Sequence, residues 1–99
     1  MKFPLVCLAL VLPAPALAAL SGFHDRAAQI AAITGSEAVA EALRQLPIEK
    51  IEHEETRADG SARWEVEGPD CDLDVILTPT APQGVGATVW TVASVGRCD

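Results

Sequence analysis

Carboxylates dominate the chemistry that this chain could perform. Four glutamates alternate with other residues along two segments that we expect to be neighbouring strands, namely Glu52, Glu54, Glu65 and Glu67. Because side chains two residues apart point to the same face of a strand, all four carboxylates are predicted to share the outer face of one sheet. Ca²⁺ binds such oxygen ligands in sets of about six to eight. One hypothesis is therefore a divalent-cation site formed by these glutamates, although their spacing matches no EF-hand loop.

An acidic sheet face of this kind can also form without a bound metal. The expected pairing places like charges opposite each other, as with Glu54 and Glu65, and such pairs destabilise a sheet. Asp72 and Asp74 on the following strand should extend the acidic face. The repulsion can be relieved by solvation and the protein's own Arg63 and Lys50, by bound Ca²⁺, or by the basic surface of a partner.

Few residues could act as a nucleophile or a base. The chain has two histidines, His24 and His53, and no tyrosine. It contains no G-x-S-x-G, H-E-x-x-H or C-x-x-C motif and no Gly-rich phosphate loop. His53 lies between Glu52 and Glu54, whose charges would influence its protonation. We therefore expect no enzymatic activity, and the sequence assigns no catalytic or cofactor-binding residue.

The first eighteen residues have the three parts of a secretory signal peptide. Lys2 precedes an apolar run over residues 3–12, and Ala16 and Ala18 form an A-x-A cleavage site. The run is shorter than the roughly 20 apolar residues of a membrane-spanning helix. The sequence thus predicts cleavage after Ala18, a single mature domain over residues 19–99, no membrane attachment after cleavage, and a periplasmic or secreted location.

The cysteines predict a crosslink in the mature domain, and its charge argues against two classes of binding partner. Cys7 lies in the signal peptide, so Cys71 and Cys98 remain, and two cysteines in an oxidising compartment predict one disulfide. Loss of Lys2 leaves six Lys and Arg against fourteen Asp and Glu, a net charge of −8. The basic residues are scattered along the chain, which argues against binding to nucleic acid or anionic membranes.

Apolar spacing predicts two helices at the N-terminal end. The first covers residues 23–33, and Arg26 and Gln29 fall outside its apolar stripe. That stripe, expected to be buried, consists of Phe23, Ala27, Ile30 and Ala31. The second helix is expected to follow Thr34, which forms a capping box with Glu37, and to end before Pro47.

From Ile48 onward the apolar pattern has a period of two. Asp59-Gly60 predicts a two-residue hairpin turn between strands 48–57 and 62–67, and Gly68-Pro69 predicts the next turn. In this register Trp64 lies opposite Glu55 and Leu73. The expected inner-face residues of the second and third strands include Ala62, Trp64, Val66, Cys71, Leu73 and Val75.

The expected disulfide sets the register of the last hairpin. If Cys71 pairs with Cys98, the third and fourth strands flank a Pro- and Gly-rich loop over residues 79–87, and Leu77 lies opposite Val92. Trp90, Val92 and Cys98 then face inward. The sequence therefore predicts an α+β domain with one or two N-terminal helices packed on a four-stranded antiparallel meander, held by one disulfide.

Apolar residues on the outer side of the fourth strand predict an interaction surface. The expected members are Ile76, Val89, Ala93 and Val95. An exposed apolar strand usually has a cover. Either the N-terminal segment of the chain or another protein could provide it.

One part of the chain resembles a known family. The segment Ile33-Thr34-Gly35-Ser36-Glu37-Ala38-Val39-Ala40-Glu41-Ala42-Leu43, the acidic strand, Asp59-Gly60 and Trp64-Glu65-Val66-Glu67 resemble the helix and hairpin of PepSY-type periplasmic domains. The resemblance covers residues 33–67. After Gly68 the chain departs from the pattern, with a disulfide-bearing hairpin in place of a D-x-x-T-G-type turn. The resemblance implies a role in modulating or inhibiting partner proteins outside the cytoplasm, and it carries over no catalytic residue.

Together these features predict an exported, non-enzymatic binding module, an inhibitor or accessory subunit of a periplasmic protein. The alternative is a divalent-cation-binding protein that uses the acidic sheet face.

Overall fold

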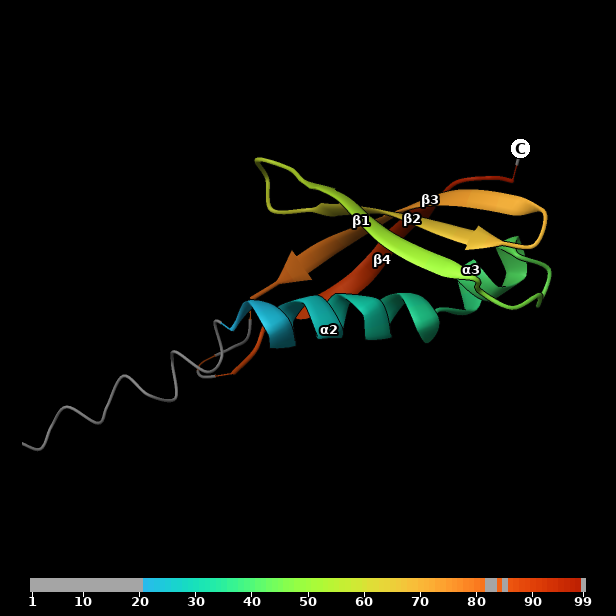
Figure 1. Cartoon of the computed structure of the whole chain (residues 1–99). Helices are drawn as coiled ribbons and strands as arrows, with labels where there is room; N and C mark the ends of the chain where they lie inside the picture. Colours follow the sequence, from blue (N-terminus) through green and yellow to red (C-terminus); the bar gives the residue numbers. More distant parts are fainter. Residues whose placement is uncertain (1–20, 82–83, 85, 99) are drawn as a thin grey trace, which may run out of the picture.

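The structure, a computed structural model, describes residues 21–81, 84 and 86–98. Its helices are α2 (Gly22–Thr34) and α3 (Glu37–Ala42), and its strands are β1 (Lys50–Thr56), β2 (Ala62–Gly68), β3 (Cys71–Thr80) and β4 (Val89–Val95). The strands form one antiparallel sheet in the order β1-β2-β3-β4, and both helices lie against one side of it (Figure 1). The predicted α+β class, the meander and the Cys71–Cys98 disulfide are confirmed.

The predicted signal peptide over residues 1–18 and its cleavage site lie outside the described residues. In the part of the chain that is described, no helix has the length and apolar character needed to cross a membrane.

Serine hydroxyls begin both helices. The Ser21 hydroxyl accepts a hydrogen bond from the N–H of His24, and the Ser36 hydroxyl accepts one from the N–H of Val39. The predicted capping box of Thr34 and Glu37 is therefore wrong. Thr34 is instead the last residue of α2, and its hydroxyl donates to backbone carbonyls one turn earlier.

The second helix is shorter than predicted. It ends at Ala42, and Arg44 and Gln45 then take positive φ angles of 57° and 63°. Left-handed residues of this kind stop a helix. The chain therefore leaves the helix before Pro47, the residue that the sequence suggested as its stop.

The helix α2 presents the opposite face to the sheet from the one predicted. Gln29 and Ile33 are buried, whereas Phe23 is 77% exposed and Ile30 is 38% exposed. The expected buried stripe of Phe23, Ala27, Ile30 and Ala31 is therefore wrong. The observed face buries Ile33 and satisfies Gln29 in the core, where the indole N–H of Trp64 donates to its side-chain oxygen at 2.8 Å. The many alanines of this helix favour neither face strongly, so these two residues are enough to select the face that packs on the sheet.

The core lies between the helices and the face of the sheet that carries Trp64. Its buried apolar residues are Ile33, Val39, Leu43, Ala62, Trp64, Val66, Leu73, Val75 and Leu77. The inner face predicted for β2 and β3 is thus confirmed, apart from Cys71, which is only partly buried.

The β1–β2 hairpin differs from its prediction. The N–H of Arg57 donates to the carbonyl of Ser61 at 2.8 Å, and Gly60 has a φ of 92°. The loop therefore has three residues and ends in a glycine bulge. A second bulge leaves Glu54 without a partner, so Trp64 lies opposite His53 and not opposite Glu55.

The β2–β3 register is displaced by two residues from its prediction. Gly68 pairs with Cys71, so Pro69 and Asp70 form the turn, and Trp64 lies opposite Val75 and not opposite Leu73. Proline suits the second position of such a turn. A displacement by two residues leaves each side chain on the same face of the sheet. The residues predicted for the core are therefore buried although the predicted register is wrong.

The β3–β4 register is confirmed near the loop, where Leu77 lies opposite Val92. Further along, a bulge leaves Ala93 without a partner, and Val95 then lies opposite the buried Val75. Val95 therefore packs against the core. Its predicted place on the outer surface is wrong, because one extra residue reverses the alternation of the strand.

Candidate functional site

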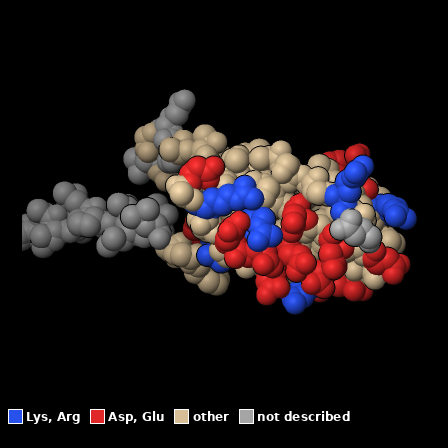
Figure 2. Space-filling model, turned by 90° about the horizontal axis from the view of Figure 1, so that it is seen from above, with Lys and Arg blue, Asp and Glu red and all other residues tan. Residues whose placement is uncertain are grey.

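The predicted metal ligands lie together on the outer face of the sheet. Glu52, Glu54 and Glu65 each place a carboxylate oxygen within 4.8 Å of the others, and Glu65 forms a second such group with Glu67 and Asp72. The structure thus joins the four predicted glutamates through Glu65 and adds Asp72. Seen from above, acidic side chains gather over this face beside an uncharged area (Figure 2).

Positive charge neutralises this acidic face unevenly. The Arg63 guanidinium lies 3.2 Å from a carboxylate oxygen of Glu55 and 3.5 Å from one of Asp74. The hydrogen bond from Arg63 is the main reason that the pKa of Glu55 lies below its ordinary value. Glu65 shows the opposite effect. Loss of hydration raises the pKa of Glu65, and the charge of Glu67 raises it further.

An uncharged strand borders the acidic face. The seven residues of β4 include no charged side chain, and none of them is buried. Val89 is 57% exposed, Ala93 is exposed, and Ile76 of β3 is partly buried beside them. Of the four residues predicted as a partner surface, Ile76, Val89 and Ala93 therefore remain on the outer face.

A shallow hollow lies where β4 ends. It encloses about 390 Å³ and is lined by Glu65, Asp72, Leu73, Asp74, Gly96 and Arg97. Gly96 continues the ladder beyond β4, because its N–H donates to the carbonyl of Asp74 at 2.8 Å. With no side chain on Gly96, the carboxylate of Asp74 is not screened from the open side of β4.

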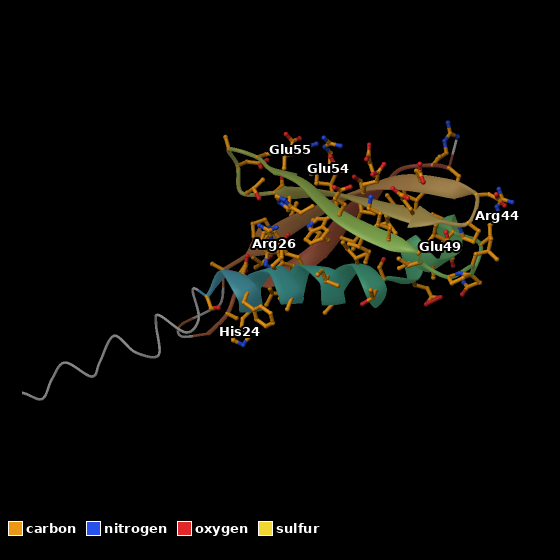
Figure 3. All side chains as sticks on the ribbon, viewed as in Figure 1. His24, Arg26, Arg44, Glu49, Glu54 and Glu55 are labelled. Atoms are coloured by element: carbon orange, nitrogen blue, oxygen red, sulfur yellow. A yellow bond between two sulfur atoms is a disulfide. The ribbon has the colours of Figure 1, made fainter. Side chains whose placement is uncertain are left out.

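The two histidines lie away from this surface. The His53 ring packs edge-on against Trp64, and its Nε2 lies 3.0 Å from the hydroxyl oxygen of Thr56. Partial burial and the charge of Arg26 lower the pKa of His53. His24 is exposed at the start of α2 (Figure 3). The Nδ1 of His24 lies 3.2 Å from the hydroxyl oxygen of Ser21, so each histidine has one hydroxyl neighbour.

Sequence reasoning missed a polar network that fastens β4 to α2. The side-chain amide of Gln29 bonds to Trp64 and donates to Asp25 at 3.1 Å, and the indole N–H of Trp90 donates to Asp25 at 2.9 Å. Asp25 and Gln29 are four residues apart on one helix face, and both tryptophans were expected on the inner sheet face. Those two features together were the signal in the sequence that could have predicted this network.

The charged residues lie on both sides of the sheet. Glu54 and Glu55 lie on the far side of the sheet from α2, whereas Arg26 lies between α2 and the sheet (Figure 3).

No family model, no curated protein and no solved structure matches this chain.

Proposed function

We propose that this chain is an exported, non-enzymatic binding module that binds a protein partner through the β4 edge, defined as Val89–Val95 together with Ile76 and Gly96. One observation carries the proposal. The edge strand β4 is uncharged, has no buried residue, and is free of a pairing strand on its outer side within the described residues. Unpaired backbone groups of an edge strand are a ready template for another strand.

The surroundings of the edge support this role. The indole of Trp90 is bonded to Asp25, and the chain just past β4 is crosslinked to β3 by the disulfide. A strand held in this way loses little conformational freedom when a partner binds, which lowers the cost of association. The resemblance to PepSY-type domains over residues 33–67 also favours an inhibitor or accessory subunit.

The test is capture of partners from the exported fraction by the tagged mature protein. In the edge variant, Val89→Lys and Ala93→Lys place charges on exposed positions of β4, and we expect saturable capture by the wild type to be lost. The matched control, Ala58→Lys, adds the same side chain to the exposed β1–β2 loop and should capture normally. Equal capture by the edge variant and the control, with circular dichroism showing both folded, would refute the proposal.

A second candidate function is divalent-cation binding, supported by the two carboxylate groups that share Glu65. Calorimetry with Ca²⁺ tests it. Binding should release or absorb heat at millimolar metal or below, and Glu65→Gln should abolish the signal because it disrupts both groups. Glu41→Gln on α3 is the control. A flat titration of the wild type would remove this candidate.

A further inference from the structure

The β4 edge ends beside negative charge. Three carboxylates, from Glu65, Asp72 and Asp74, line the hollow over Gly96, and Arg97 supplies one positive charge. Asp74 already shares Arg63 with Glu55, so that cation is divided between two carboxylates. The hollow therefore has an excess of negative charge immediately next to uncharged backbone that can pair.

A strand added to β4 would lie within reach of this hollow. Neighbouring strands lie about 4.8 Å apart, so an added strand would lie about two such spacings from β3. The long stem of a Lys or Arg side chain covers part of that distance over Gly96, and the side chain of Asp74 extends to meet its charge. Gly96 places no side chain in the path, and Asp74 lies directly across from it.

Charge also distinguishes two molecules that could pair with the β4 edge, namely a second copy of this chain and a basic segment of a partner. The chain has a net charge of −7, so a second copy paired along β4 would bring two negative surfaces together. A partner segment with positive charge would instead be attracted to the edge and aligned by the hollow, because complementary charge speeds encounter and fixes register.

We propose that the β4 edge binds an extended partner segment with uncharged, strand-forming residues beside Val89–Ala93 and a Lys or Arg beside Gly96. Its backbone pairs with the outer N–H and C=O groups of β4, and its cation lies among Glu65, Asp72 and Asp74. This inference rests on the proposed function, since it names the chemistry of the segment that the same edge would bind.

Selection from a display library of random twelve-residue peptides on the full exported protein tests the inference. Enriched peptides should contain a run of β-branched or aromatic residues with Lys or Arg at one end. In low salt, Asp72→Asn with Asp74→Asn should weaken their binding about tenfold, and the loss should shrink in high salt. Glu37→Gln with Glu41→Gln removes the same charge from α3 and should leave affinity unchanged.

The outcomes separate this inference from the proposed function. Peptides that lose binding in the Val89→Lys/Ala93→Lys variant but bind the Asp72→Asn/Asp74→Asn variant normally would overturn the basic segment and keep the edge. Peptides indifferent to both variants, or no enrichment at all, would overturn both ideas. A concentration-dependent dimer that Ala93→Lys dissociates would identify a second copy as the occupant and also overturn the inference.

Discussion

The two edges of the sheet, β1 and β4, differ in one property that matters for binding. Both are seven residues long, neither contains a buried residue, and each carries a bulge. The difference is charge, because β1 has charged side chains at Lys50, Glu52, Glu54 and Glu55, whereas β4 has none. Charged residues are a common protection of sheet edges against pairing with other chains. The strand β1 therefore carries this protection, and β4 does not.

The two edges are also held differently. The strand β1 is joined to the rest of the molecule mainly through its ladder with β2. The strand β4 is bonded to α2 through Trp90 and Asp25 and followed by the disulfide at Cys98. The open edge is thus the one with additional anchors, as expected of a strand that must keep its shape while it is exposed.

The largest expected effect comes from removing the covalent anchor. Replacing Cys71 and Cys98 by serine opens a loop with a sequence separation of 27 residues. On the chain-entropy argument this should lower the free energy of unfolding by about 3–4 kcal/mol. Urea denaturation measures it, with the wild type under reductant as the control. Hydrogen exchange should accelerate in β4 more than in β1. Equal acceleration in both strands would show that the disulfide does not hold β4 in particular.

Substitution of the two tryptophans compares the stability that side-chain hydrogen bonds contribute at the centre of the sheet and at its open edge. Trp64→Phe leaves the buried side-chain oxygen of Gln29, a residue 3% exposed, without its donor, and should cost about 1–3 kcal/mol. Trp90→Phe removes the donor to Asp25 at a partly exposed position, where water can replace it. Its cost should be smaller, and urea denaturation of both variants gives the comparison. Equal losses would mean that β4 is packed as tightly as β2.

Much of this fold is predictable from the sequence, because the alternation of apolar and polar residues shows which side chains share a face of the sheet. It does so even where the register between strands is not known. The inner positions of β2 and β3 were assigned correctly although both hairpin registers near Trp64 were displaced. The displacements arose at turns, where Gly60 and Pro69 allow several loop lengths that the pattern does not distinguish, and at the bulge of Glu54. The disulfide register was right near Leu77, and the bulge at Ala93 then reversed the position of Val95.

The helix face and the site were harder to predict for a different reason. The apolar stripe through Phe23 and Ile30 is ordinary evidence for burial, but the helix instead buries Ile33 and Gln29, and Gln29 bonds to Trp64. This bond joins residues 35 positions apart in the sequence, so it is not visible in the local spacing of apolar residues. The acidic face followed from alternation alone, whereas the hollow beside Gly96 depends on where the β3–β4 ladder ends.

Removing the charges of β1 should create a second open edge. We expect Glu52→Thr with Glu54→Thr to strengthen self-association about tenfold relative to the wild type, or about 1.4 kcal/mol. The matched control is Glu65→Thr with Glu67→Thr, which removes two carboxylates from the same acidic face but from the central strand β2. Sedimentation over a range of concentrations measures the effect. Similar association of both variants would attribute it to net charge and not to the edge.

The smallest effect concerns the balance of charge beside each edge. Near β1, the hydrogen bond from Arg63 lowers the pKa of Glu55 below its ordinary value of 4.5. This carboxylate therefore stabilises the fold above about that value, and the contribution is lost as the pH falls through the lowered pKa. Loss of hydration and the charge of Glu67 raise the pKa of Glu65 above 4.5. Its charged form therefore destabilises the fold at neutral pH, and the penalty disappears as the pH falls through the raised pKa.

Glutamine substitutions should then act with opposite signs. At pH 7, Glu55→Gln should lower the midpoint of urea denaturation, and Glu65→Gln should raise it. Both shifts should be small, because the side chains reach solvent, and both should vanish at a pH well below 4.5, where the carboxyls are protonated in the folded and unfolded states. A lowered midpoint for Glu65→Gln at pH 7 would mean that Glu65 is compensated by a cation. In that case the hollow beside β4 would no longer have the unneutralised charge that is expected to attract a basic segment.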